Sequence, residues 1–421
     1  MIRIDDQTIN IKKIKYKYRP DGEIVEFILN GSDGAGGINH TERTGEPLTS
    51  TLLEKWFRDS TTNTISSEKI SEFLLRSDTA SVIEEYATEA CAVIWGKNRD
   101  EAANLAEAFL RYQVIAKEAA ELKDWEERRA LVASLLKAEH IKAGMFEFKD
   151  SSDKYRPIIL EDLFSPVTRN TLFSNKSRVA SIRLCRAAQD KVKAFLDDCK
   201  KIFNYEQYFV DKRRHDILEA IGVTVCPYCN RQFISLYGES KDRYSTADID
   251  HFYNKDRFPF LAMSPYNFIP SCQICNSRFK LVSDFYAKPH INPYKSGFGS
   301  NARFEIENIE AIIDATKKPV IKVHTNCGDS MARNSIETFH IEELYQNHSD
   351  YAKELINKAQ IFSSSQIEEY LNAYDGHFAS KEELFRTIYG NYLEEENQGK
   401  RPLSKLTQDL LFDLSVRIDY D

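Results

Sequence analysis

The chain has 421 residues, of which 42% are hydrophobic and 29% charged, and its formal net charge is −8 at pH 7. This length is enough for two or three compact units with a sizeable core, and the balance is that of an ordinary soluble protein. The acidic total excludes binding of nucleic acid through a uniform positive field, so any such contact must be a local patch. Residues 205–300 are the local exception, with 12 Lys and Arg against 10 Asp and Glu.

The eight cysteines and the first residues of the chain indicate the cellular compartment in which we expect the protein. A disulfide framework is typical of short secreted chains rather than of a chain this long. The start, Met1-Ile2-Arg3-Ile4-Asp5-Asp6, has no apolar core, so no signal peptide is expected. No apolar run approaches the roughly 20 residues that span a membrane. We therefore expect a protein of the reducing cytoplasm with no membrane partner.

The first elements in chain order are strands. Residues 11–30 are rich in β-prone side chains on both sides of Arg19-Pro20-Asp21-Gly22, which predicts a β-hairpin. The glycine-rich residues 31–37 follow. They lack the Gly-Lys-Ser/Thr ending of a phosphate-binding loop, so a flexible linker is favoured.

Helical periodicity then dominates. Apolar residues recur at helical spacing over residues 68–146, and a further long helix is predicted over residues 176–203. Three arginines lie along that second helix: Arg178, Arg183 and Arg186. We favour a solvated helix face for them over a stripe that faces DNA.

The remaining pattern divides the chain into four segments. Lys212-Arg213-Arg214-His215 is interpreted as a basic helix face, short strands are expected within residues 302–325, and helices resume from Ile341. The segments are an N-terminal hairpin and linker region (1–65), a helical region (66–215), a central module (216–300) and a mostly helical C-terminal region (301–421).

Two Cys-x-x-Cys pairs mark the central module: Cys226-Pro227-Tyr228-Cys229 and Cys272-Gln273-Ile274-Cys275, with 42 residues between them. Zinc accepts four thiolates in a tetrahedron, and each such turn presents two sulfur atoms to one ion. Two pairs can close one site if the chain between them loops out and returns, and the metal then contributes to folding. A redox pair needs one copy, so two copies favour a shared structural Zn²⁺ over redox chemistry or buried free thiols.

The residues between the pairs predict a strand–strand–helix unit. Residues 230–237 and 244–252 are expected to form the two strands, and a helix is expected to open at Cys275-Asn276. Alternation along the second strand places Asp248 and Asp250 on one face and His251 on the other, unless the strand bulges or ends there. A supporting and a direct role for Asp248 both stay open.

The side chains of this unit suit hydrolysis of a phosphodiester, which needs an activated water, a cation and orientation. His251 is the natural general base, because imidazole titrates near neutral pH. Asp250 and Asn276 can supply hard oxygen ligands to a divalent cation. Asn267 can fix the imidazole or the backbone through hydrogen bonds.

Two cations on the predicted helix, Arg278 and Lys280, are placed to hold phosphate oxygens. Structural alternatives exist for the proposed site. Asp250 can belong to a solvated strand face, His251 can be a satisfied core histidine, and Asn276 can cap the helix. The occurrence of the whole set in order favours the catalytic interpretation.

These residues resemble a known signature. Asp248-x-Asp250-His251-Phe252, Asn267 and Cys272-x-x-Cys275-Asn276-x-x-x-Lys280 look like the motif of HNH endonucleases, over about residues 222–284. The resemblance implies a ββα-metal core braced by zinc, with His251 as base, Asp250 and Asn276 on the catalytic cation, and Asn267 steadying the site. Asparagine in the last position is similar to the HNN variant of CRISPR effector nucleases, and its amide oxygen favours Mg²⁺ or Mn²⁺.

We therefore expect an α+β, mainly helical protein with a small zinc-braced ββα-metal HNH core that hydrolyses DNA. Two flanking segments, Ile291-Asn292-Pro293-Tyr294 and Arg401-Pro402-Leu403-Ser404-Lys405-Leu406, are weakly similar to prokaryotic HNH proteins of anti-phage defence, which implies an ATPase partner protein. The alternatives are a catalytically silent zinc-braced nucleic-acid-binding module, and a restriction or mobile-element nuclease.

Overall fold

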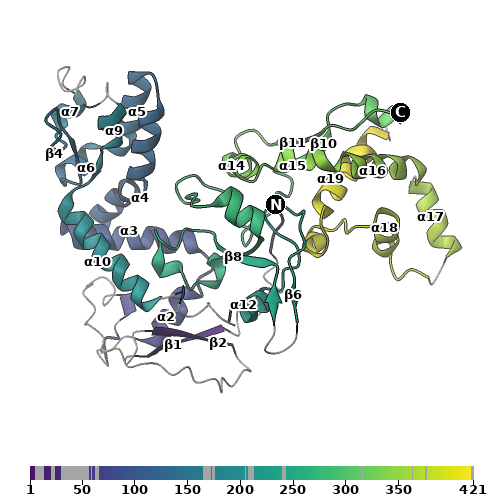
Figure 1. Cartoon of the computed structure of the whole chain (residues 1–421), viewed down its shortest axis with the longest axis horizontal. Coiled ribbons are helices and arrows are strands. Elements are labelled where there is room, and N and C mark those ends of the chain that lie inside the picture. The colour runs from purple at the N-terminus through teal and green to yellow at the C-terminus, as the bar shows by residue number, and fades with distance from the viewer. Residues whose placement is uncertain are drawn as a thin grey trace. The chain divides into compact units, whose positions relative to one another are not determined.

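The structure is a computed structural model (Figure 1). It describes residues 1–4, 14–19, 24–29, 56–57, 59–61, 66–164, 172, 176–203, 205–206, 213–238, 243–314, 316–362, 364–374 and 377–418. Within them the protein is mixed α+β and mainly helical, with small sheets of two or three strands, as expected.

Contacts divide the chain into two compact units. Unit 1 contains residues 1–14, 206–254 and 265–421, and unit 2 contains residues 15–205 and 255–264. The expected boundary at residue 215 lies near the division at 205/206, whereas the central module and the C-terminal region share unit 1.

Unit 2 begins with two strands, β1 (Ile14–Arg19) and β2 (Ile24–Leu29), which are hydrogen-bonded neighbours as the hairpin prediction requires. The predicted turn and the glycine-rich residues 31–37 lie outside the described residues. The predicted helices follow as α2 (Ser67–Leu74), α3 (Thr79–Trp95), α4 (Arg99–Glu121), α5 (Trp125–Leu135) and α6 (Ala138–Lys142).

The predicted helix over residues 176–203 is wrong in its middle. Helix α9 (Lys176–Ala180) ends, the short strand β5 (Arg183–Leu184) follows, and α10 (Arg186–Ile202) then begins. Strand β5 pairs with β3 (Phe146–Lys149), which also pairs with β4 (Tyr155–Pro157).

Arg183 explains why an extended strand replaces the helix. Its guanidinium is 2.7 Å from the Glu147 carboxylate and lies 3.3 Å from the centre of the Tyr155 ring. Both partners belong to the same sheet, Glu147 to the neighbouring strand β3 and Tyr155 to β4 on its other side, so they hold Arg183 there. Local helical periodicity does not reveal such long-range contacts.

Residues 255–264 leave the central module and enter the aromatic core of unit 2. The Phe260 ring lies 4.7 Å from that of Tyr86 and 6.2 Å from that of Phe195. The Arg257 guanidinium donates a hydrogen bond to the carbonyl oxygen of Leu110. The loop that follows His251 is therefore anchored by burial rather than exposed.

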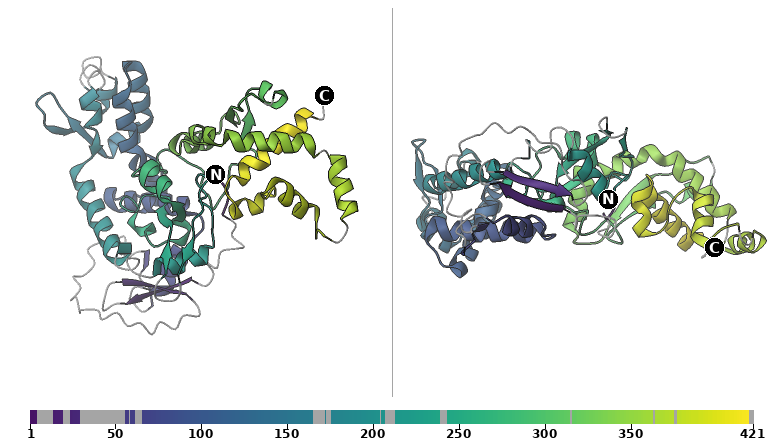
Figure 2. Two further views of the ribbon diagram at one scale, coloured as in Figure 1. Left: turned by 45° about the vertical axis from the view of Figure 1, so that its right-hand side comes forward. Right: turned by 90° about the horizontal axis from the view of Figure 1, so that it is seen from below.

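In the C-terminal part of unit 1, β10 (Ala302–Ile306) pairs antiparallel with β11 (Ile321–Thr325), as expected for this stretch. The helices after Ile341 are also confirmed, and α19 packs against α16 in the green to yellow part of the chain in Figure 2. They are α15 (Ile341–Tyr345), α16 (Ser349–Ile361), α17 (Ser364–Ala373), α18 (Lys381–Tyr389) and α19 (Ser404–Ile418), preceded by α14 (Ser330–Thr338).

Residues 1–4 pack against the central module of unit 1. The Ile2 amide donates to the Pro227 carbonyl oxygen at 2.9 Å. A Cβ atom at Gly297 would lie 2.9 Å from the backbone nitrogen of Arg3, closer than real Cβ contacts allow. Gly297 is therefore required by the close approach of these two backbones.

Asn230, directly after the first cysteine pair, joins that pair to the start of α19. Its Nδ2 donates to the Gln398 carbonyl oxygen at 3.1 Å, and its Oδ1 accepts from the Lys405 amide at 3.0 Å and the Ser404 hydroxyl at 3.2 Å. Its own carbonyl oxygen accepts from the Leu403 amide at 2.6 Å. Asn230 is fully buried with a left-handed φ of 51°, so only a small residue with this amide suits the position.

We predict that Asn230→Ala lowers the free energy of unfolding by about 3 kcal/mol, because it leaves buried partners unpaired and strains the backbone. Asn230→Gly should lose about 1 kcal/mol less, since glycine adopts the same φ without strain. The matched control is Asn347→Ala, which removes one exposed local hydrogen bond of 3.3 Å and should change little. Urea unfolding of the full chain measures all three, and equal effects of Asn230→Ala and Asn347→Ala would contradict the docking role.

Candidate functional site

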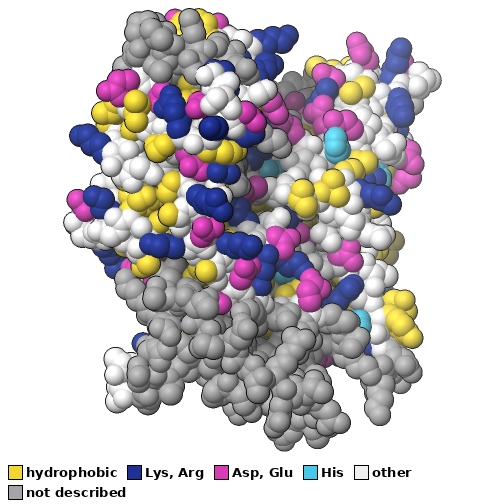
Figure 3. Space-filling model, turned by 60° about the vertical axis from the view of Figure 1, so that its left-hand side comes forward, with side chains coloured by type: hydrophobic (Ala, Val, Ile, Leu, Met, Phe, Trp, Pro, Cys, Tyr) yellow, Lys and Arg dark blue, Asp and Glu magenta, His cyan; other side chains and the backbone are white. Residues whose placement is uncertain are grey.

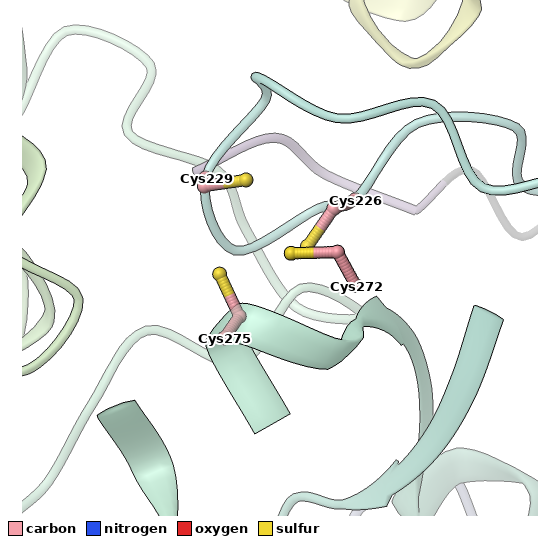
Figure 4. A group of neighbouring side chains, drawn as sticks. All are labelled: Cys226, Cys229, Cys272 and Cys275. Atoms are coloured by element: carbon pink, nitrogen blue, oxygen red, sulfur yellow. The ribbon is translucent and has the colours of Figure 1, made fainter. Parts of the chain in front are cut away.

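The four cysteines Cys226, Cys229, Cys272 and Cys275 form one buried group, called the cysteine cluster below. Their sulfur atoms all lie within 4.8 Å of one another and point into one space (Figure 4). Tetrahedral zinc with Zn–S distances of about 2.3 Å places its sulfur ligands roughly 3.8 Å apart. The cluster can therefore hold a metal ion such as Zn²⁺ with small movements, as the spacing of the two pairs predicts.

The thiols of the cysteine cluster already differ in acidity. Hydrogen bonds among the thiols, first from Cys226, hold the pKa values of Cys272 and Cys229 below the ordinary cysteine value. Burial raises the pKa of Cys226. The arrangement thus favours thiolates at some positions, and thiolate is the form that binds a metal.

The predicted strand over residues 230–237 is wrong for most of its length. After Asn230 the chain forms only an isolated bridge from Phe233 to Val225 and the two-residue strand β6 (Leu236–Tyr237), paired with β7 (Tyr244–Ser245). The physical reason is the Cys-x-x-Cys turn, which ends in the left-handed Asn230 and docks on the C-terminal region.

A different segment pairs with the strand that carries the acids. Strand β8 (Ala247–His251) runs antiparallel to β9 (Phe268–Cys272), with Asp250 opposite Ile269 and His251 opposite Phe268. Every residue of β9 is buried, and the strand ends at Cys272. The helical turn Cys275–Lys280 follows with π-type hydrogen bonding. A strand–strand–helix unit is therefore present, and its second strand brings one cysteine pair into the cluster.

Two side-chain contacts connect this helical turn to β8. Asn276 Nδ2 donates to Asp248 Oδ2 at 3.3 Å, and Lys280 Nζ donates to Asp250 Oδ1 at 2.8 Å. Positions two apart on a strand share a face, as do positions four apart on a helix. The prediction that Asp248 and Asp250 share one face is thus confirmed. We call Asp248 and Asn276 the acid–amide pair.

Asp250 is enclosed by the protein. Its second oxygen, Oδ2, accepts a hydrogen bond from the Tyr228 hydroxyl at 2.5 Å. Burial, and next the Asp250 charge, raise the pKa of Tyr228 well above its usual value, so the hydroxyl remains a donor. The side chains of Lys280 and Asp250 are only 3% and 5% exposed. Both carboxylate oxygens therefore have partners within the fold.

Lys280 and Arg278, both expected to hold phosphate, occupy different environments. The Lys280 ammonium also donates to the His251 carbonyl oxygen at 2.6 Å, so its donors are directed into the protein. Arg278 is exposed. Arg278 is accessible to a ligand, whereas Lys280 stabilises the strand that carries Asp250 and His251.

His251 and Asn267 lie at the ends of the two strands. His251 is 8% exposed, and its ring packs edge-on against Phe268 at 5.3 Å between centroids. Alternation along β8 directs it to the face opposite Asp250. Asn267 is fully buried, and its amide both accepts from the Tyr253 amide at 2.8 Å and donates to the Tyr253 carbonyl oxygen at 3.0 Å. Asn267 thus fixes the backbone two residues after His251.

Three residues near this unit were not assigned a role from the sequence. Tyr228 supports Asp250, and Arg214 contacts the acid–amide pair from the helix α12 (Arg213–Ile221). Tyr228 lies inside a Cys-x-x-Cys motif and Arg214 in a basic run, but neither pattern identifies the acid that it contacts. His290 is structural: it stacks on Phe285 at 3.8 Å, and burial lowers its pKa to about 4.

Charges of both signs are interspersed on the surface shown in Figure 3, in agreement with the acidic total. No helix among the described residues is long and apolar enough to cross a membrane.

Comparisons with protein-family models, with curated proteins and with solved structures found no match to this chain.

We predict that the purified chain contains about one tightly held zinc ion, lost in Cys226→Ser together with thermal stability, because the ion joins two distant segments. Cys327→Ser is the matched control, since Cys327 is exposed and outside the cluster. Metal analysis by mass spectrometry measures both variants. Protein prepared without chelators and free of metal would contradict a structural ion.

Lys280→Met should lower the free energy of unfolding by about 3–5 kcal/mol, because it leaves the buried Asp250 carboxylate without its counter-charge. The control Lys288→Met removes an exposed ion pair with Glu337 of 3.1 Å and should cost less than about 1 kcal/mol. Chemical unfolding compares the two variants. A similar small loss in both would show that Asp250 does not depend on Lys280.

Proposed function

We propose that this protein is a metal-dependent HNH-type endonuclease that hydrolyses DNA phosphodiester bonds. The observation that carries the proposal is the strand–strand–helix unit. Asp248, Asp250 and His251 lie on its first strand, Asn276 of the helical turn contacts Asp248, and Cys272 and Cys275 belong to the cysteine cluster. Binding alone does not require an acid–histidine pair beside oxygen ligands, whereas phosphodiester hydrolysis does.

In the proposed reaction His251 removes a proton from the attacking water, and Asn267 holds the backbone that positions His251. Asp250 and Asn276 are the candidate ligands of a divalent cation, Mg²⁺ or Mn²⁺, which would stabilise charge on the leaving oxygen. Asp250 would bind the cation through a lone pair left beside its hydrogen bonds with Tyr228 and Lys280, or after exchange of one of these partners.

A second candidate function is a catalytically silent zinc-braced module that binds nucleic acid. It is favoured by the burial of Asp250 and by the occupation of both its oxygens by Tyr228 and Lys280. In that case Asp250 is a structural acid and the cysteine cluster only shapes a binding surface. The two candidates differ in one result, which is cutting of DNA in Mg²⁺ or Mn²⁺.

The biological setting is a further part of the proposal. The weak similarity of residues 401–406 and 291–294 to prokaryotic anti-phage defence proteins supports a nuclease effector that acts with an ATPase partner protein. The net charge of −8 implies weak binding of free DNA by the chain alone, which agrees with an assembly that delivers the DNA.

We predict that the full chain nicks or cuts plasmid DNA in Mg²⁺ or Mn²⁺ and that His251→Ala slows this by at least about 100-fold, since general-base catalysis supplies 10²–10⁴-fold. His324→Ala, at an exposed position of β11, should leave the rate unchanged. Gel assays with and without EDTA, at constant zinc content, measure both. Cutting by His251→Ala at the wild-type rate would overturn the mechanism, and DNA binding without cutting by the wild-type chain would favour the silent module.

A further inference from the structure

Arg214 contacts the acid–amide pair although it lies far from it in the sequence. From α12, it donates a hydrogen bond through Nη2 to the Ala247 carbonyl oxygen at 2.5 Å. The same nitrogen is 3.7 Å from Asp248 Oδ1, while Asn276 contacts Asp248 Oδ2 at 3.3 Å. A guanidinium and an amide therefore lie beside the two oxygens of one carboxylate.

Stability does not account for the contact between Arg214 and Asp248. Their side chains are 38% and 29% exposed, and partly exposed pairs of this kind contribute about 0–1 kcal/mol. The contact is also 0.9 Å longer than the buried one between Lys280 and Asp250, from distances of 3.7 Å and 2.8 Å. Arg214 Nε is buried without a hydrogen-bond partner, so the guanidinium uses only part of its five donors.

Two other cations whose side chains the structure describes near α12 and β8, Lys280 and Arg243, have acidic partners. Lys280 is directed into the protein, as described above. Arg243 binds Asp216 at 3.2 Å and Glu219 at 2.6 Å, both on α12. Among the described side chains, Arg214 is the cation that the structure places beside the partly exposed carboxylate of Asp248.

The charge of Arg214 also acts on the next residue of α12. The pKa of His215 is lowered first by burial and then by the charges of Arg214 and Arg243, while Asp216 raises it. A guanidinium beside partly exposed oxygen ligands suits an anion bound together with a metal cation.

We propose that Arg214 binds the phosphate at which the nucleic acid is cut, in place of the weak contact with Asp248. A guanidinium can hold two phosphate oxygens at once, which a lysine ammonium does with less directional precision. Transfer of the guanidinium from Asp248 to phosphate would also leave Oδ1 of Asp248 free to turn toward the site. This role makes Arg214 a substrate-binding residue, and it rests on the proposed nuclease function.

The test compares Arg214→Gln and Arg214→Lys with the control Arg243→Gln, a change on a residue that is held by acids of α12. Binding of a fluorescein-labelled DNA duplex in Ca²⁺ is measured against salt, and plasmid cutting is measured in Mg²⁺. Loss of one phosphate contact should reduce the slope of log K against log salt by about 0.9. For Arg214→Gln we expect this reduction of the slope and about 100-fold slower cutting. Arg214→Lys should keep the full slope, because it keeps the charge, but should cut more slowly. Arg243→Gln should change neither the slope nor the rate.

Three outcomes would overturn the assignment. In the first, Arg214→Gln retains both the wild-type salt slope of DNA binding and the wild-type rate of cutting. In the second, it loses stability in thermal unfolding while the salt slope is unchanged. In the third, it matches Arg243→Gln in every measurement. The second outcome would make Arg214 a structural anchor of α12. A wild-type chain that neither binds nor cuts DNA would overturn the proposed function itself and the role of Arg214 with it, so the two failures are distinguishable.

Discussion

Four buried sulfur atoms come together from two segments of the chain that are not paired with each other in a sheet or a helix. One cysteine pair lies in an irregular turn, and the other spans the end of β9 and the helical turn after it. The strand that carries Asp250 pairs with β9, so its position relative to the helical turn depends on the same cluster. A metal ion could bind all four sulfur atoms only in the folded chain, so its binding free energy would stabilise this arrangement directly.

Burial separates the roles of the two acids on β8. Withdrawal of a carboxylate and an ammonium from water costs several kcal/mol per ion, and good geometry is needed to offset it. Asp250 has that geometry, with Lys280 on one oxygen and Tyr228 on the other. Asp248 is partly exposed and contacts Arg214 and Asn276 through longer distances. Asp250 is therefore firmly placed, whereas the contacts of Asp248 can exchange with a ligand at little cost.

The cysteine cluster is also coupled to the C-terminal region of unit 1. Asn230 binds the start of α19, and the Tyr345 hydroxyl donates to the Cys229 carbonyl oxygen at 2.7 Å. Lys405 then pairs with Asp409 at 2.6 Å, and Asp409 accepts from the Phe304 amide of β10. A continuous set of buried polar contacts thus links the cysteine turn to a strand and a helix of the C-terminal region, so a change in one alters the stability of the other.

The sequence by itself determined the features that depend on local spacing. The two Cys-x-x-Cys pairs predicted the cluster, and apolar periodicity predicted most helices. The Asn267 amide was expected to bind either the imidazole or the backbone, and it binds the backbone of Tyr253. Only the tertiary structure decided that β9 rather than residues 230–237 pairs with β8, that Arg183 breaks the expected helix, and that Lys280 serves Asp250. These outcomes depend on contacts between residues 17 or more positions apart, such as His251 with Phe268, Lys280 with Asp250 and Arg183 with Glu147. Periodicity and spacing describe neighbours along the chain, whereas burial and pairing partners are set by the folded whole.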